Sequence, residues 1–147
     1  NMDRTHEPTL KVKRLHPDAV LPSAAHEGDS GLDLSSIEGG MLYPGTRRMF
    51  RTGLSIQLPE NYEGQIRPRS GLFGKYGVSC HFGTIDNGYS GEICVLLFNI
   101  DEKPFEVKPG MRIAQLVLSW IIPAVVTEVL DIQENGRGTQ GFGSSGL

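Results

Sequence analysis

Glycine and proline occur so often in this chain that only short segments of regular structure fit between them. The 147 residues include 19 glycines and 9 prolines. The segments between them have strand-like composition, and short strands separated by such turn residues are typical of an all-β sandwich or barrel. One helical turn is expected over Gly71–Tyr76, with Ser70 as its N-terminal cap. We therefore predict one all-β domain, residues 1–147, with a single short helix.

Ten segments are expected to form strands. Glu92–Ile100 is an almost unbroken apolar run, which predicts a strand covered on both faces and, in so small a chain, burial between subunits. The pair Asn87-Gly88 is preferred in tight turns, so a β-hairpin is expected around it. The predicted strands are Thr9–Leu15, Leu32–Leu34, Arg47–Arg51, Leu54–Gln57, Glu63–Pro68, Val78–Phe82, Gly91–Asn99, Phe105–Val107, Ala114–Trp120 and Val125–Val129.

The overall composition is that of a globular protein, with 38% hydrophobic and 21% charged residues. No apolar run approaches the roughly 20 residues that cross a bilayer, and the polar N-terminus lacks a signal-peptide core. We therefore expect no membrane association and a cytoplasmic location. The net charge of −3 argues against a nucleic-acid partner. Cys80 and Cys94 are expected to be free, buried thiols.

The two ends of the chain are expected to differ from the folded domain. Asn1 precedes Met2, so residues 1–8 are interpreted as a disordered or tag-derived start. Residues 135–147 are rich in glycine and predict a mobile tail, which usually has no role. This tail, however, combines a fixed cation, an aromatic ring, hydroxyls and open N–H groups, which can wrap a phosphate chain and stack on a base. These groups belong to Arg137, Phe142, Gly143, Ser144 and Ser145.

Asp86 stands at the mouth of the predicted hairpin, directly before the Asn87-Gly88 turn. An aspartate in this place often only caps the turn, and local position alone favours that role. The alternative is a general base for water, with the ring of Tyr89 beside whatever the carboxylate faces. Asp86 by itself therefore does not decide between a structural and a catalytic role.

Two further segments have the residue types that bind phosphate and metal. Arg67–Leu72 places a guanidinium and a hydroxyl where a strand ends, which suits a phosphate, although a capped turn beside a surface arginine explains it equally well. Asp29–Leu34 carries two carboxylates four residues apart, and Mg²⁺ often binds through one or two carboxylates, waters and substrate phosphates. Pro109–Leu116, a turn entering a strand, has no functional signal by itself.

Several common classes of site lack their sequence pattern. The histidines and cysteines do not have the spacing of a zinc site. The chain also has no P-loop and no GxSxG nucleophile elbow, and its glycine-rich run lacks the strand-to-helix context of a dinucleotide site. Zinc enzymes, P-loop kinases, serine hydrolases and dehydrogenases are therefore disfavoured.

Five segments, in this order along the chain, resemble the five motifs of the trimeric dUTPase family. The set of five is far more specific than any one of them. The segments are Asp29–Leu34, Pro68–Leu72, Gly83–Glu92, Gly110–Leu116 and Arg137–Gly146.

The resemblance implies a jelly-roll-like β-barrel or sandwich that forms a homotrimer with swapped C-terminal tails. It also implies three active sites, each assembled from neighbouring subunits, which hydrolyse dUTP to dUMP and pyrophosphate with Mg²⁺. Such an enzyme keeps uracil out of DNA and supplies dUMP for thymidylate synthesis. A regulatory protein partner is compatible with the sequence but has no signal in it.

By resemblance, motif three binds the nucleoside and activates water. Asp86 would deprotonate the water that attacks the α-phosphorus, while Tyr89 would pack against the deoxyribose and leave no room for a 2′-hydroxyl. Backbone groups of Gly83, Thr84 and Ile85 would pair with the edge of uracil.

The other four motifs are implied to hold the triphosphate. Arg69, Ser70 and Gly71 would bind the α- and β-phosphates, with the Ser70 hydroxyl near the bridging oxygen. Asp33 and Gln115 would hold waters of a Mg²⁺ ion that the triphosphate chelates. In the tail, the implied contacts are Arg137 with the γ-phosphate, Phe142 over uracil, and Gly143, Ser144 and Ser145 with phosphate oxygens.

Four positions depart from the commoner family pattern, and two alternatives to a dUTPase are open at this point. One is dCTP deaminase, which shares the fold and trimer but uses a glutamate in a different hairpin. The other is a non-catalytic module that senses dUTP or binds a regulatory protein. Asp86, Tyr89 and the complete tail argue against the deaminase, and Asp86 argues against the non-catalytic module. Activity is therefore expected despite the departures at Cys80, Gly88, Ser90 and Gln140.

Overall fold

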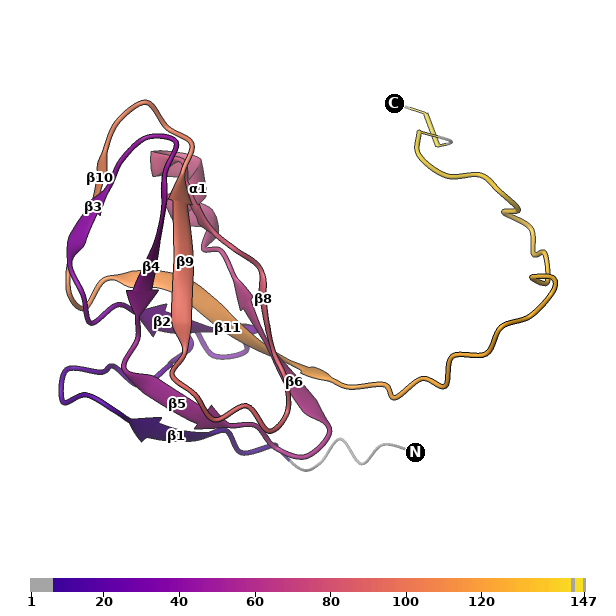
Figure 1. Ribbon diagram of the computed structural model, residues 1–147, viewed down its shortest axis with the longest axis horizontal. Coiled ribbons are helices and arrows are strands. Elements are labelled where there is room, and N and C mark those ends of the chain that lie inside the picture. Colours follow the sequence, from indigo (N-terminus) through magenta and orange to yellow (C-terminus); the bar gives the residue numbers. More distant parts are fainter. Residues whose placement is uncertain (1–6, 144, 147) are drawn as a thin grey trace.

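The computed structural model describes residues 7–143, 145 and 146, and its strands form a barrel-like body (Figure 1). The predicted all-β class with one short helix is confirmed. The elements are β1 Lys11–Arg14, β2 Gly31–Ser35, β3 Gly40–Leu42, β4 Arg47–Arg51, β5 Leu54–Gln57, β6 Tyr62–Arg67, α1 Ser70–Tyr76, β7 Val78–Cys80, β8 Gly83–Ile85, β9 Cys94–Asn99, β10 Phe105–Val107 and β11 Arg112–Trp120.

The strands pair in an antiparallel manner and form two larger and two smaller sheets. The larger sheets have the strand orders β2-β11-β6-β8 and β4-β9-β7, and the smaller ones are the pairs β1-β5 and β10-β3. Most partners are far apart in sequence, as in β11 with β2 and β1 with β5. The residues of one surface region therefore come from several distant segments.

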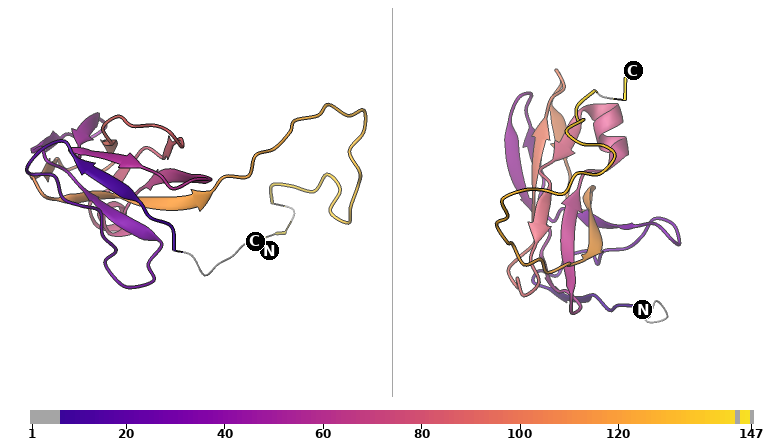
Figure 2. Two further views of the ribbon diagram at one scale, coloured as in Figure 1. Left: turned by 90° about the horizontal axis from the view of Figure 1, so that it is seen from below. Right: turned by 90° about the vertical axis from the view of Figure 1, so that its right-hand side faces the viewer.

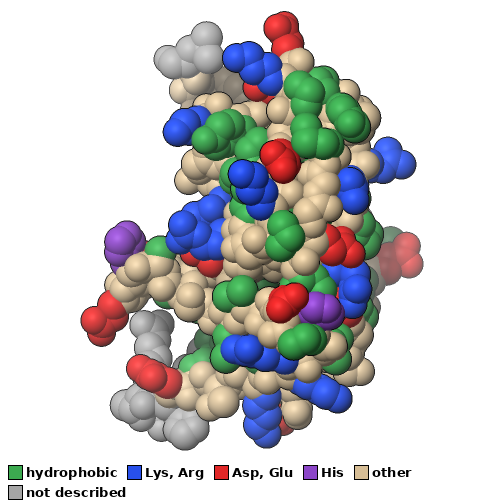
Figure 3. All heavy atoms as spheres, turned by 90° about the vertical axis from the view of Figure 1, so that its left-hand side faces the viewer, with side chains coloured by type: hydrophobic (Ala, Val, Ile, Leu, Met, Phe, Trp, Pro, Cys, Tyr) green, Lys and Arg blue, Asp and Glu red, His purple; other side chains and the backbone are tan. Residues whose placement is uncertain are grey.

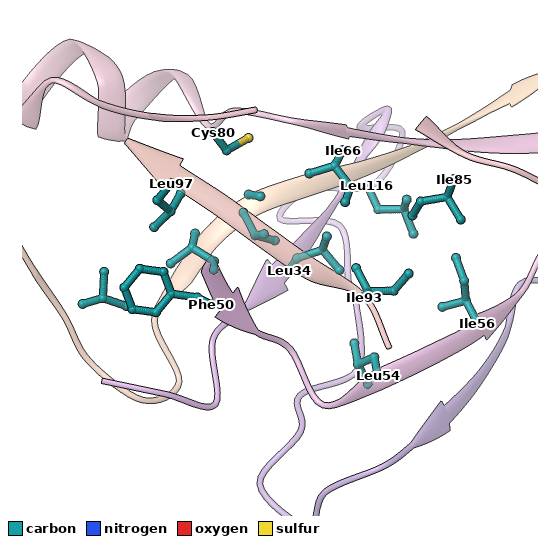
Figure 4. Close-up of a cluster of buried hydrophobic side chains, with 14 of the residues drawn as sticks. Leu34, Phe50, Leu54, Ile56, Ile66, Cys80, Ile85, Ile93, Leu97 and Leu116 are labelled. Atoms are coloured by element: carbon teal, nitrogen blue, oxygen red, sulfur yellow. The ribbon is translucent and has the colours of Figure 1, made fainter. Parts of the chain in front are cut away.

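A cluster of apolar side chains fills the space between the two larger sheets (Figure 4). Leu34, Phe50, Leu97 and Leu116 come from four different strands, and each is fully buried. Because successive side chains of a strand point to opposite faces, these residues direct their polar neighbours outward. The outward face of the β2-β11-β6-β8 sheet is consequently available for a polar site.

One strand prediction was wrong, and one short strand was missed. Val125–Val129 forms no strand, because the chain leaves the body after β11 and no other described strand lies beside this segment. Its residues Val125 and Val126 are 92% and 95% exposed. Gly40–Leu42, which was not predicted, is a strand because it pairs with β10.

The predicted hairpin at the Asn87-Gly88 turn was also wrong. β8 pairs with β6, whereas β9 pairs with β4 and β7, so residues 86–93 cross from one sheet to the other. β9 alternates between buried and half-buried residues, so within the chain only one of its faces is fully covered. Ser70 does not cap α1, because the helix begins at Ser70 and Arg69 occupies the N-cap position without a side-chain hydrogen bond.

The two cysteines are free, as predicted, but they differ in burial. Cys80 is buried and Cys94 is half-buried. Burial raises the pKa of the Cys80 thiol to about 11. The pKa of Cys94 is also raised, first by burial and then by the negative charge of Glu92. Both thiols are therefore held in the protonated, unreactive form at neutral pH.

The segment 121–143 lies outside the body and is exposed along its whole length (Figure 2). On the body face that Figure 3 shows, basic and acidic side chains are intermixed with small apolar groups. That face therefore carries no extended patch of one charge. Among the described residues, no helix has the length and apolar character needed to span a membrane.

Candidate active site

One surface hollow, of about 340 Å³, collects residues from motifs one, two and four. We call it the Arg69 hollow. It brings together five residues that were predicted to contact phosphate or metal-bound water. Its lining residues are Ala25, Asp29, Ser30, Gly31, Asp33, Arg69, Ser70, Gly71 and Gln115.

The floor of the Arg69 hollow is set by strand register. Asp33 on β2 and Gln115 on β11 are direct cross-strand partners, so their side chains stand together on the outward face. Gln115 Nε2 donates to the Pro68 carbonyl at 3.0 Å, which leaves the amide oxygen available to another donor. A side chain at Gly31 would overlap the Gln115 amide, so the glycine of motif one leaves room for the glutamine of motif four.

Asp33 lies between two guanidinium groups. Its Oδ1 is 3.3 Å from Arg69 Nε, its Oδ2 is 3.7 Å from Arg112 Nη1, and 15% of its side chain is exposed. Arg69 Nη1 also donates to the Arg112 carbonyl at 3.3 Å. No described residue accepts a hydrogen bond from Arg69 Nη2. The chain thus fixes the Arg69 guanidinium and leaves one of its nitrogens free for a ligand.

A second hollow, of about 400 Å³, contains motif three. We call it the Asp86 hollow. It holds the predicted nucleoside contacts, and apolar side chains from β4, β6 and β9 complete its walls. Its lining residues are Met49, Ile66, Gly83, Thr84, Ile85, Asp86, Tyr89, Glu92, Ile93 and Cys94.

Asp86 is presented by a tight turn at the end of β8. The Tyr89 N–H donates to the Asp86 carbonyl at 3.1 Å, and Gly88 has a φ of 97°, a value that favours glycine. Asn87 Nδ2 donates to the carbonyls of Pro59 and Tyr62, each at 2.9 Å, and so fastens the turn to the body. The Asp86 side chain is exposed, and no described residue donates a hydrogen bond to its carboxylate. Both oxygens are therefore available to water or substrate.

β8 is an edge strand. In the sheet order β2-β11-β6-β8 it is hydrogen-bonded only to β6 among the described strands. In an antiparallel pair, alternate residues direct their backbone N–H and C=O groups away from the partner strand. The Gly83–Ile85 backbone consequently offers both donors and acceptors at the rim of the Asp86 hollow.

The two hollows share no lining residue. Asp33 and Gln115 belong to β2 and β11, whereas Thr84 belongs to β8, on the other side of β6. The structure thus collects motifs one, two and four in one place and motif three in another.

Motif five lies apart from both hollows. The last backbone hydrogen bond between the tail and the body is from the Ile121 N–H to the Asn61 carbonyl, at 2.8 Å. Within the described part of the tail, Arg137 Nε donates only to the Gln140 carbonyl, at 2.8 Å, and Phe142 is fully exposed. Of the other predicted tail contacts, Gly143 and Ser145 lie in this exposed segment, and Ser144 lies outside the described residues.

Comparison with known proteins decides the family. A protein-family model described as dUTPase matches residues 18–146. The chain belongs to the dUTPase family. The resemblance based on the five motifs, the class of enzyme and the jelly-roll-like fold are thereby confirmed.

Known dUTPases are similar to this chain along nearly its whole length. The deoxyuridine 5'-triphosphate nucleotidohydrolase of Clostridium tetani is 51% identical over 142 residues, which cover 95% of this chain and 98% of that protein. The one of Clostridium kluyveri is 48% identical over 139 residues, with 93% and 97% covered. A mutant dUTPase of Staphylococcus bacteriophage 80alpha with dUpNHpp superposes with a TM-score of 0.89, at 29% identity, and covers 95% of this chain and 99% of that chain.

Two charged residues in the dUTPase motifs were not among the predicted site residues. Arg112 and Arg69 both form ion pairs with Asp33, and Glu92 lines the Asp86 hollow. Both stand inside recognised motifs, so their position along the chain was the signal that could have found them. Their partners belong to distant segments, and composition does not reveal such contacts.

Proposed function

We propose that this chain hydrolyses dUTP to dUMP and pyrophosphate in active sites that are shared between copies of the chain. The observation that carries the proposal is the separation of two complementary hollows. The Arg69 hollow has the charge and hydroxyl groups that suit a triphosphate. The Asp86 hollow has a free carboxylate, an edge strand and apolar walls, which suit a nucleoside and an attacking water.

A homotrimer with swapped tails is part of this proposal. The tail segment 121–132 exposes a series of large apolar side chains, and burial against a neighbouring copy removes them from water. The half-buried face of β9 is a further candidate for such burial. In the assembly, Val125–Val129 gains the strand partner that it lacks among the described strands of one chain. The side chains concerned are Ile121, Ile122, Val125, Val126, Val129, Leu130 and Ile132.

The Arg69 hollow is proposed to bind the triphosphate. Arg69, held by Asp33, donates to the α- and β-phosphates together with Ser70 and the Gly71 backbone. The Ser70 hydroxyl lies near the bridging oxygen, where negative charge develops as pyrophosphate leaves. These groups act by positioning and by charge stabilisation, which are the main requirements of phosphoryl transfer.

The donor set of the Arg69 hollow fits Mg²⁺ held through water. The described residues contain no cluster of three or more His, Cys, Asp or Glu side chains that could enclose a metal ion. Mg²⁺ commonly keeps several waters and relies on substrate phosphates, so it does not require such a cluster. The Asp33 carboxylate and the free amide oxygen of Gln115 can accept hydrogen bonds from those waters. The bound ion supplies positive charge to the triphosphate.

The Asp86 hollow is proposed to select the nucleoside and activate water. The Gly83–Ile85 backbone pairs with the uracil edge, and the close walls exclude a 5-methyl group. Tyr89 packs on the deoxyribose and rejects a 2′-hydroxyl. Asp86 takes the proton of the water whose oxygen bonds to the α-phosphorus, while the bond to the bridging oxygen breaks and pyrophosphate departs.

The tail is proposed to close over the occupied site. Arg137 pairs with the γ-phosphate and Phe142 stacks on uracil, so closure requires a triphosphate nucleotide. Gly143, Ser144 and Ser145 add phosphate contacts. The activity serves to keep uracil out of DNA and to supply dUMP for thymidylate synthesis, in the cytoplasm.

A nucleotide panel with Mg²⁺ tests the proposal. Pyrophosphate release is measured for dUTP, dCTP, UTP and dTTP, and ammonia release is measured in parallel. We expect pyrophosphate from dUTP alone at low enzyme concentration. Ammonia from dCTP would replace the proposal with a deaminase, and binding of dUTP without turnover would replace it with a sensing module.

A further inference from the structure

The ring of Tyr89 is in contact with the two residues that begin the return to β9. Its hydroxyl donates to the Glu92 carbonyl at 3.0 Å. A Cβ atom added to Gly91 would lie 2.5 Å from the phenol oxygen and 2.7 Å from the ring carbon that bears it. Gly91 does not have a left-handed φ, so the close approach of the ring, and not backbone conformation, requires glycine here.

The position of Glu92 is fixed by hydrogen bonds to its side-chain carboxylate. Arg51 Nε donates to both carboxylate oxygens at 3.1 Å, and the Gly53 N–H donates to Oε2 at 3.0 Å. The Glu92 side chain is 21% exposed, so solvent weakens this pair less than it weakens a fully exposed pair. The carboxylate thereby fixes the backbone whose carbonyl receives the Tyr89 hydroxyl.

The backbone on both sides of Gly91 is hydrogen-bonded to residues 52–55, at and just before the start of β5. The Ser55 hydroxyl donates to the Ser90 carbonyl at 2.7 Å. On the other side, the Ile93 N–H donates to the Leu54 carbonyl at 2.8 Å, and the hydroxyl of the buried Thr52 donates to the Ile93 carbonyl at 2.6 Å. A clash at Gly91 is therefore relieved by movement of the Tyr89 ring more easily than by movement of the backbone.

We infer that Gly91 and Glu92 are positioning residues that fix the Tyr89 ring and so set how strongly the enzyme prefers deoxyribose to ribose. The inference rests on the proposed function, in which the Tyr89 ring rejects a 2′-hydroxyl. A steric clash rejects a substrate only if the side chain that causes the clash cannot move aside. The Tyr89 ring is restrained in this way because Gly91 lies against it and the Glu92 carbonyl accepts a hydrogen bond from its hydroxyl.

The Gly91→Ala variant tests this inference directly. The added methyl group displaces the ring, and we expect the ratio of kcat/KM for dUTP to kcat/KM for UTP to fall by about tenfold. Most of this fall should come from a higher kcat/KM for UTP, and the remainder from a higher KM for dUTP. The matched control is Gly74→Ala, because Gly74 is exposed, lies in α1 and has no atom within 4 Å of an added Cβ. The control should keep the ratio of the unmodified protein.

Two milder variants complete the test. Tyr89→Phe removes only the bond to the Glu92 carbonyl, and Glu92→Gln weakens the pair with Arg51. We expect each to lower the ratio by about threefold, an effect at the small end of the range for a hydrogen bond, because the bond from the Tyr89 hydroxyl lies in an exposed position. Tyr89→Phe adds no atom, so it carries the test if Gly91→Ala does not fold.

The outcomes separate the two proposals. If the unmodified protein does not hydrolyse dUTP, the proposed function fails. If it hydrolyses dUTP in preference to UTP, and folded Gly91→Ala and Tyr89→Phe keep that preference unchanged, only the positioning role of Gly91 and Glu92 is refuted. A loss of kcat for both nucleotides with an unchanged ratio also refutes it, because a general structural defect has that signature.

Discussion

Residues 86–93 and residues 121–143 both carry predicted substrate contacts on exposed side chains, but the chain attaches them differently. The loop is tied to the body along its length, through Asn87, Ser90, Glu92 and Ile93. Among the described residues, the tail is hydrogen-bonded to the body only at its start, through Ile121. A fixed loop loses little conformational entropy when substrate binds, whereas a free tail must be ordered by the substrate itself. The loop therefore suits selection and chemistry, and the tail suits closure.

The largest expected effect is at the fixed loop. In Asp86→Asn the amide cannot accept the proton of the attacking water, so we expect kcat for dUTP to fall by about 10³-fold. Binding of a non-hydrolysable dUTP analogue, measured by calorimetry, should change by no more than about twofold because the shape of the side chain is kept. Near-normal turnover would show that Asp86 is not the general base. Residues 86–93 would then have no role in the chemical step.

Removal of residues 137–147, the end of the tail, should have the next largest effect. A chain that ends at Gly136 loses the tail contacts but keeps the apolar segment 121–132. We expect kcat/KM for dUTP to fall by about 10²-fold, because positioning and water exclusion are lost. Light scattering should still report a trimer. A shortened protein that is as active as the full chain would contradict the closing role of the tail.

Within the tail, Phe142 should account for part of that loss. Phe142→Ala removes a ring that is fully exposed without substrate, and we expect KM for dUTP to rise by about tenfold, since stacking on a base contributes about 1–3 kcal/mol. Phe142→Tyr keeps the ring and is the matched control. Equal KM values for the two variants would argue that the ring does not stack on uracil.

The smallest effect on activity is expected from loosening the fixed loop at its anchor. Thr52→Val keeps the volume of a fully buried side chain but removes its bonds with the Ile93 carbonyl and the Leu54 N–H. We expect the free energy of unfolding, measured with urea, to fall by about 1–2 kcal/mol. kcat/KM should change by only about twofold, because the other bonds of the loop remain.

Thr46→Val is the control for that measurement. The Thr46 hydroxyl also donates to a backbone carbonyl, that of Tyr43, but in an exposed position where water can replace it. We expect the free energy of unfolding of Thr46→Val to change by no more than about 0.5 kcal/mol. A loss as large as that of Thr52→Val would mean that burial does not explain the stability of the anchor.

The candidate site residues were predicted from the resemblance carried by five motifs in order along the chain, since each motif is ambiguous by itself. Asp86, Arg69 and Gln115 each stand in a motif whose members are neighbours in sequence, so the pattern is visible without a structure. The predicted turn at Asn87-Gly88 was correct, because its backbone conformation depends on local residue types. The hairpin expected around that turn was wrong, because strand pairing does not depend on the turn alone.

The sequence by itself determined the fold class, the family and the composition of the five motifs, since these follow from residue types close together along the chain. Only the tertiary structure decided where the motifs meet. Strand partners are chosen by the joint burial of inward side chains such as Ile66, Ile85 and Leu116, which come from three distant segments. That burial joins β8 to β6, places Asp86 and Arg69 toward opposite ends of β6, and leaves Val125–Val129 without a partner among the described strands.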